Sequence, residues 1–145
     1  MKKVVLLLVV VSFSLVFPEP VHSAEEVADG NSTLTDCSLA LDMAQDKYVE
    51  HVIKGAETLP SSGQQTKAIQ CMSYVIGFKD AIYVGEIFQE KNGKQPSICL
   101  PFNNLNNELA VRVVVKYLRD NPQLLSGPQS GLVFNAFFHA FPCGK

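Results

Sequence analysis

Residues 64–90, QQTKAIQCMSYVIGFKDAIYVGEIFQE, decide the fold. From Ala68 to Phe88 this stretch carries apolar residues on most faces of a helix, which is typical of a central, largely buried element. Ser62 followed by Gln65 resembles a capping box at its start. The polar turn at residues 91–94 ends it. We therefore expect one long central helix against which the other elements pack.

Three further segments show the helical period, with apolar residues recurring at spacings of three and four. They predict helices over residues 35–54, 105–120 and 129–141, and Thr33 or Thr35 can cap the first of them. The expected apolar face of the third helix uses Leu105, Leu109, Val113 and Tyr117, joined by Val114 and Leu118. The pattern predicts an all-α fold, a compact bundle of about four helices.

The first residues resemble an export signal. Lys2 and Lys3 precede an apolar run over residues 4–17, which is too short for the ~20 residues of a spanning helix. We expect residues 1–23 to be a cleaved secretory signal peptide, residues 24–33 a flexible N-terminal tail and residues 34–145 the helical domain. The mature protein is then periplasmic or secreted, with no membrane association.

Length and net charge indicate a single domain and argue against a nucleic-acid-binding function. The chain has 145 residues, with 12 Lys+Arg against 14 Asp+Glu and a net charge of −2. This length suits one domain. Because there is no basic stripe, no nucleic-acid partner is expected.

Four cysteines in an exported chain predict two disulfides, which staple the bundle. Three pairings are possible. If the third and fourth helices form an antiparallel hairpin, Cys99 before it and Cys143 after it lie at the same end, so that a Cys99–Cys143 bond is natural. Cys37 then pairs with Cys71 by elimination, which requires the first two helices to cross.

Two features of the central helix invite a structural explanation. Gly77, Ala81 and Gly85 form a stripe of small residues, and glycine destabilises a helix interior by ~1 kcal/mol relative to alanine, so we expect another backbone to approach there. Asp80 beside Lys79 lies within an apolar segment, where a buried carboxylate would need a partner.

The sequence carries none of the residue patterns sought for catalytic, phosphate-binding or metal sites. His51 and His139 have no second metal ligand at helical spacing, and there is no Gly-rich phosphate loop, Gly-x-Ser-x-Gly or His-Glu-x-x-His. We expect no enzyme activity, no cofactor and no metal.

Several segments together resemble the Rap/Tai family of immunity proteins, which guard against type VI secretion amidase effectors. The matching pieces are Cys71-Met-Ser-Tyr74-Val-Ile-Gly77-Phe-Lys-Asp80, Cys99-Leu-Pro101, Val114-Val115-Lys116-Tyr117-Leu118 followed by Asn121-Pro122, Leu132-Val133 with Ala136, and Phe141-Pro142-Cys143; Cys37 agrees with the family's N-terminal cysteine.

The resemblance implies a small helical periplasmic homodimer that binds a bacterial peptidoglycan amidase and occludes its active-site groove. Exposed turns are candidates for the contact, and we expect it at Leu59, Pro60, Ser61, Ser62, Lys94 and Gln95.

Two other functions compete with this one. An HdeA-like periplasmic stress chaperone would also be small, helical and disulfide-bonded. A small helical carrier would hold an apolar ligand in a pocket lined by Phe134, Phe137, Phe138 and Phe141.

Overall fold

Four α-helices and a short 3-10 helix make up this computed structural model, which describes residues 28–45, 60–101 and 103–144. In chain order they are α1 (Gly30–Ala44), α3 (Ser62–Lys91), α4 (Asn107–Asp120), η1 (Pro122–Leu124) and α5 (Gln129–Ala140). No strand occurs among the described residues. The predicted all-α fold is confirmed.

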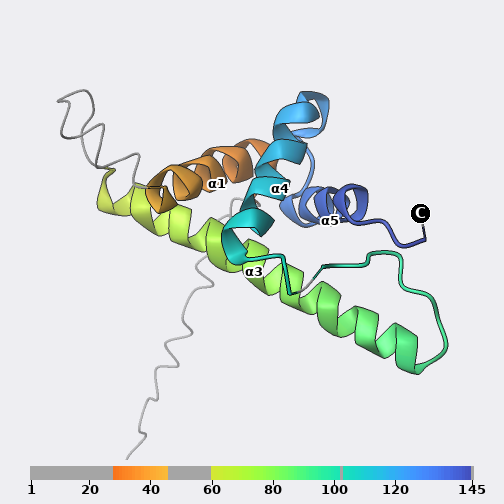
Figure 1. Cartoon of the computed structure of the whole chain (residues 1–145). Helices are drawn as coiled ribbons and strands as arrows, with labels where there is room; N and C mark the ends of the chain where they lie inside the picture. Colours follow the sequence, from red (N-terminus) through yellow and green to blue (C-terminus); the bar gives the residue numbers. More distant parts are fainter. Residues whose placement is uncertain (1–27, 46–59, 102, 145) are drawn as a thin grey trace, which may run out of the picture.

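The long helix α3 is the axis of the molecule (Figure 1). Its 30 residues span about 45 Å at 1.5 Å per residue. Helix α1 packs on α3 and α4, and α5 packs chiefly on α4. The residues between them form one core, in which Val75, Val114, Leu118, Val133 and Phe137 are fully buried.

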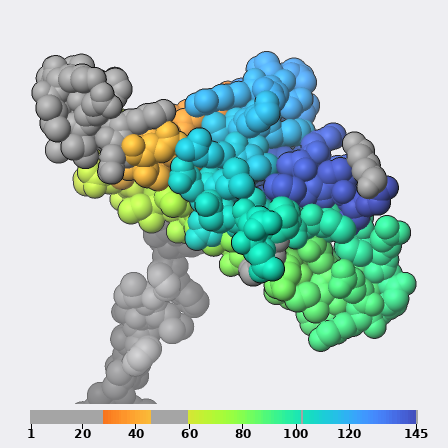
Figure 2. Space-filling model, in the orientation of Figure 1, coloured from red at the N-terminus to blue at the C-terminus, as the bar shows by residue number. Residues whose placement is uncertain are grey.

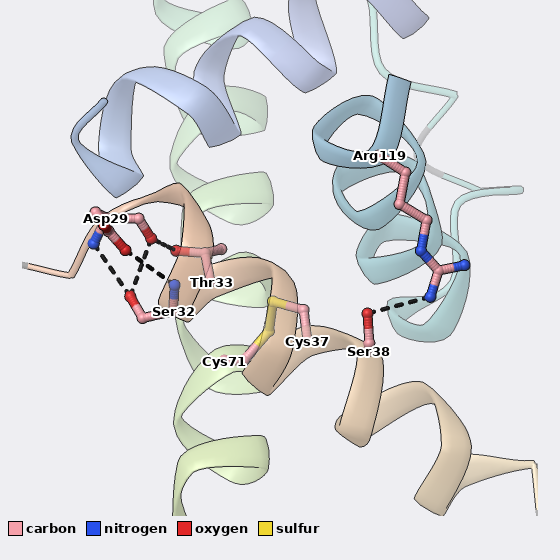
Figure 3. Close-up of a disulfide and its surroundings, with 7 residues drawn as sticks. All are labelled: Asp29, Ser32, Thr33, Cys37, Ser38, Cys71 and Arg119. Atoms are coloured by element: carbon pink, nitrogen blue, oxygen red, sulfur yellow. Dashed lines mark hydrogen bonds between the residues drawn. A yellow bond between two sulfur atoms is a disulfide. The ribbon is translucent and has the colours of Figure 1, made fainter. Parts of the chain in front are cut away.

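Helix α1 begins earlier than predicted. Asp29, not Thr33 or Thr35, is its N-cap: the Asp29 carboxylate accepts from the Ser32 amide at 2.9 Å and the Ser32 hydroxyl accepts from the Asp29 amide at 3.1 Å (Figure 3). These bonds satisfy amides that a helix start otherwise leaves unpaired. Residues 30–33, expected in a flexible tail, are therefore helical. Gln45 is the C-cap, and residues 46–54 of the predicted helix lie outside the described residues.

Among the described residues, a close backbone approach occurs at Gly30 and not at Gly77 or Gly85. A Cβ at Gly30 would lie 2.8 Å from the Cα of Leu125, and the Gly30 amide donates to the Gly127 carbonyl at 3.1 Å. A Cβ at Gly77 or Gly85 would meet no described atom within 4 Å. The backbone that was expected to approach the small-residue stripe is therefore not found in residues 28–45, 60–101 and 103–144.

The other helix bounds fall close to the predicted ones. Ser61 and Gln64 form the capping box of α3, one residue before the predicted pair. Helix α4 turns its apolar face differently from the expectation: Leu109 is exposed, while Ala110 and Val111 are buried. The residues of α4 that face the core are Ala110, Val111, Val114, Val115 and Leu118.

Both disulfides have the predicted pairing, Cys37–Cys71 and Cys99–Cys143. The first joins α1 to α3 where the two helices cross, inside the core (Figure 3). The second joins the segment before α4 to the segment after α5. The bundle is thus stapled at two separate places.

Candidate partner-binding surface

The two turns predicted to bind a partner lie at opposite ends of α3, about 45 Å apart along the helix. At its start, Pro60 is buried, Ser61 and Ser62 are exposed, and Leu59 lies outside the described residues. At its end, Lys94 and Gln95 are both exposed. Because of this separation, the five described residues of the predicted set do not form one compact surface.

The end of α3 projects from the bundle. Residues 82–91 continue α3 past α4, and residues 92–101 turn back toward the rest of the protein (Figures 1 and 2). We call residues 82–101 the lobe and residues 92–101 the strap. The turn between helix and strap needs a glycine, because Gly93 has a φ of 67°. The Lys94 amide donates to the Gln89 carbonyl at 2.8 Å and closes the turn.

The strap is fixed to the bundle by its second half. The Cys99 amide donates to the Phe141 carbonyl at 2.9 Å, and the Cys143 amide donates to the Ser97 carbonyl at 3.4 Å. On the other side, the Leu100 amide donates to the Glu86 carboxylate of α3 at 2.9 Å. The side chains of Ile98 and Leu100 are buried. The strap therefore bridges α3 and the C-terminal segment.

A groove of about 180 Å³ lies where the lobe meets α5. Its walls come from α3, the strap and α5, and the lining residues are Ile82, Gly85, Glu86, Gln89, Pro96, Ser97, Ile98 and Phe134.

The lobe and its surroundings also expose large apolar side chains. Phe88 is 61% exposed and Phe134 is 43% exposed, and Val84 and Phe138 are exposed as well. Val84 and Phe88 belong to the lobe itself, whereas Phe134 and Phe138 belong to α5, and exposed aromatic side chains are enriched where proteins bind one another. Lys94 and Gln95, which were predicted contacts, lie in this lobe, whereas Phe88 was not predicted, and Phe134 and Phe138 were predicted only as the lining of a carrier pocket.

Glu86 is the ionisable residue of the groove. Burial raises the pKa of its carboxyl group, although the hydrogen bond from the Leu100 amide acts in the opposite direction. The neighbouring carboxylate of Glu90 raises the pKa further. The groove therefore combines apolar walls with a carboxylate that is already engaged by the strap.

A buried carboxylate was expected at Asp80, but the buried member of the Lys79–Asp80 pair is the lysine. Lys79 is buried, at 6% exposure, and Asp80 is exposed. The Lys79 ammonium donates to Asn107 Oδ1 at 2.9 Å and lies 3.5 Å from Asp80 Oδ1. The long side chain of lysine carries its charge to a polar partner across the helix interface, so the Lys79–Asn107 hydrogen bond ties α3 to the start of α4.

The four phenylalanines proposed to line a carrier pocket do not share one. Phe137 is in the core, whereas Phe134 and Phe138 are exposed and stack on each other with their ring centroids 6.1 Å apart. A second, open groove of about 270 Å³ lies between α4 and α5, where Tyr117 stacks on His139. A closed ligand cavity formed by these rings is not part of the described fold.

The described residues carry neither a cluster of metal ligands nor a membrane-spanning helix. Among residues 28–45, 60–101 and 103–144, no group of three or more His, Cys, Asp or Glu side chains could hold a metal ion. No helix in this part of the chain has both the length and the apolar content needed to cross a bilayer.

The described residues form a disulfide-stapled helical domain with a lobe that projects from the bundle and exposes Val84 and Phe88. The sequence profile of the Rap1a immunity proteins matches residues 29–143, so the chain belongs to this family. No curated protein and no solved structure matches the chain. An immunity protein acts on a partner effector, so the family implies that this chain has such a partner.

Proposed function

We propose that this protein binds and inhibits a peptidoglycan amidase delivered by type VI secretion, without catalysing a reaction itself. The match to the Rap1a immunity proteins over residues 29–143 carries the proposal. It favours inhibition of an effector over the chaperone and carrier functions. The motifs shared with the Rap/Tai family point to an amidase as the effector.

The lobe is the part of the structure best suited to enter an enzyme groove. It projects from the bundle (Figure 2) and exposes Phe88 at its surface. The strap is held to α3 by the hydrogen bond to Glu86 and to the C-terminal segment by the Cys99–Cys143 bond, so the lobe is ordered before binding. Preorganisation reduces the entropy lost on association. Lys94 and Gln95 remain candidate contacts at its tip, and Pro60, Ser61 and Ser62 lie at the other end of the helix.

Export to the periplasm follows from the same proposal. The substrate of an amidase that cleaves peptidoglycan is outside the cytoplasm, and an inhibitor has to meet the enzyme there. Residues 1–23 have the pattern of a signal peptide, and paired cysteines are typical of an oxidising compartment.

Substitution of Phe88 tests the binding surface. We expect Phe88→Asp to weaken the affinity for the cognate amidase by about 30-fold or more, since a central aromatic contact is worth roughly 2 kcal/mol or more. Calorimetric titration with the effector measures this, and survival of cells exposed to the effector measures protection. Because the side chain is 61% exposed, the fold should be retained.

Ile69→Asp is the matched control. Ile69 lies on the same helix and is 60% exposed, but it is far from the lobe. We expect this variant to bind as the unchanged protein does. If Phe88→Asp kept full affinity and full protection, the lobe would be excluded as the contact surface. If the unchanged protein bound no amidase, the proposed function would fall.

The family resemblance also leads us to propose a homodimer, with the exposed middle of α3 as its contact. Gly77 and Ala81 are exposed there, and small residues allow a second helix to approach closely. We expect a dimer mass in analytical ultracentrifugation and a monomer mass for Gly77→Trp, with helix content unchanged in both. A monomeric unchanged protein would contradict the proposal.

A further inference from the structure

The groove between the lobe and α5 has the size of a site for a side chain. Its volume is about 180 Å³, whereas pockets that hold small-molecule ligands or cofactors measure about 300–1,000 Å³. Its walls come from three separate segments, α3, the strap and α5. The volume therefore favours one extended side chain of a partner protein as the occupant, rather than a free ligand.

The lining of the groove limits the chemistry of that side chain. Of the eight described residues that line the groove, Glu86 is the ionisable one, and most of the others are apolar. Phe134 contributes an aromatic ring that is 43% exposed, so the ring is accessible to a partner. An occupant that satisfies both features has an apolar stem and a cationic end.

The carboxylate of Glu86 has a free side. Its Oε1 accepts a hydrogen bond from the Leu100 amide at 2.9 Å. Its Oε2 has no hydrogen-bond partner among the described residues, and it is not sealed from solvent, because no described side-chain oxygen or nitrogen is both buried and unpaired. None of the ion pairs between described residues includes Glu86 or its neighbour Glu90. A cation at Oε2 would therefore complete this site.

We propose that the groove receives an arginine side chain of the partner protein, whose guanidinium group pairs with Glu86 while its stem lies against the apolar walls. The proposal rests on the proposed function, since the partner is the effector. Arginine suits the site better than lysine, because its planar group has five donors for a carboxylate that is already engaged on one side and can stack on a ring such as Phe134. Arginine is also enriched at protein interfaces, whereas lysine is depleted.

The free protein is already prepared for this contact. An ion pair at an interface loses stability when water is removed from its charges. Burial raises the pKa of the Glu86 carboxyl group, which shows that folding has already removed part of its hydration. The Leu100 amide also fixes the orientation of the carboxylate. Binding of a guanidinium group therefore adds attraction with little further loss of hydration or side-chain freedom on the Glu86 side.

Blocked arginine, N-acetyl-arginine methylamide, tests the groove without an effector. Added to the unchanged protein, it should shift the backbone amide NMR signals of Gly85, Ser97 and Leu100 in a saturable way. Glu86→Gln removes the charge but keeps an oxygen for the Leu100 amide, and we expect it to weaken this binding at least about fivefold. Blocked norleucine, which has an apolar stem and no cation, should bind the unchanged protein at least about fivefold more weakly than blocked arginine.

Two outcomes of this titration would overturn the arginine site. One is the lack of a saturable shift at these amides with blocked arginine. The other is equal binding of blocked arginine to the unchanged protein and to Glu86→Gln.

The affinity for a cognate amidase tests the same contact in the complex. We expect Glu86→Gln to bind at least about tenfold more weakly than the unchanged protein, because the guanidinium group of the partner loses its counter-charge. Asp42→Asn is the control: it removes the same single charge from an exposed position on α1, outside the lobe, and should change the affinity less than about threefold. Equal affinities of Glu86→Gln and the unchanged protein would contradict the proposal.

The pH dependence of binding separates charge from shape. Glu90 on α3 is the charged group that acts on Glu86, and the described lining from the strap and α5 has no ionisable side chain. Protonation of Glu86 removes the charge that the guanidinium group meets. As the pH falls through the pKa of Glu86, the affinity of the unchanged protein should therefore approach that of Glu86→Gln. A ratio of the two affinities that stayed constant with pH would overturn the ion pair.

The titration with blocked arginine keeps the two proposals distinguishable. If the unchanged protein bound no amidase but bound blocked arginine in a manner that depends on Glu86, the proposed function would fail and the groove would stand as an arginine site. If the protein bound the amidase and Glu86→Gln bound it equally well, the proposed function would stand and the arginine site would fail.

Discussion

Removal of the buried disulfide, by Cys37→Ala with Cys71→Ala, should lower the free energy of unfolding by about 4 kcal/mol. The bond joins residues 34 positions apart, so its loss restores much conformational freedom to the unfolded chain. It also removes two sulfur atoms from the core. Since small domains are stable by only about 5–15 kcal/mol, the variant should be marginally folded. Urea unfolding followed by circular dichroism measures the change.

Ser38→Ala is the control for this prediction. Ser38 is the neighbour of Cys37 in α1, and its hydroxyl accepts a hydrogen bond from Arg119 Nη2 at 3.2 Å at the surface (Figure 3). We expect its loss to change the unfolding free energy by less than about 1 kcal/mol. If the double variant lost as little unfolding free energy as Ser38→Ala, the Cys37–Cys71 bond would not stabilise the fold by restricting the unfolded chain. The prediction would then be wrong.

The sequence predicted the parts of the fold that have a strong local signal. Helix α3 followed from its long apolar pattern and its capping residues, although the capping box is at Ser61 and Gln64 and not one residue later. The Cys99–Cys143 bond followed from the antiparallel hairpin of α4 and α5. In these places, helical periodicity and chain geometry determine the outcome without detailed knowledge of the packing.

The sequence did not predict how segments that are far apart along the chain pack against each other. Residues 24–33 look polar and small, so a tail was expected, yet Gly30 fits against the turn at residues 125–127 because it has no side chain. Gly77 looked like the position of a close approach, but no described part of the chain lies within 4 Å of a Cβ built there. A glycine in the sequence permits another segment to approach closely. Only the fold shows at which glycine such an approach occurs.

The candidate surface was predicted in part. Lys94 and Gln95 belong to the lobe, because polar turns that follow a long helix are exposed. The aromatic side chain of the lobe was not predicted as a contact, since Phe88 and Phe137 look alike in an apolar sequence, although one is 61% exposed and the other is in the core. Which face of α3 or α5 remains uncovered depends on where the chain places the other helices.

Phe137→Ala should destabilise the protein by about 3–5 kcal/mol, the range for truncating a fully buried phenylalanine. Phe137 is 0% exposed and is the largest of the fully buried side chains in the described residues. It lies in α5 and contacts the same core as Val114 and Leu118 of α4. Close packing leaves the neighbours little freedom to fill the space, so that a cavity adds to the lost burial. The midpoint of thermal or urea unfolding measures the change.

Phe138→Ala provides the comparison, because it removes the same ring from the next residue of the same helix. Phe138 is exposed and stacks on Phe134, so its loss leaves no cavity in the core, and we expect a change of less than about 1.5 kcal/mol. The two variants share composition, helix propensity and position in the chain. Each ring also stacks on one phenylalanine of its neighbourhood, Phe137 on Phe141 and Phe138 on Phe134, so a difference in the unfolding free energies reports chiefly the burial of Phe137. Equal values would contradict the placement of α5 against α4.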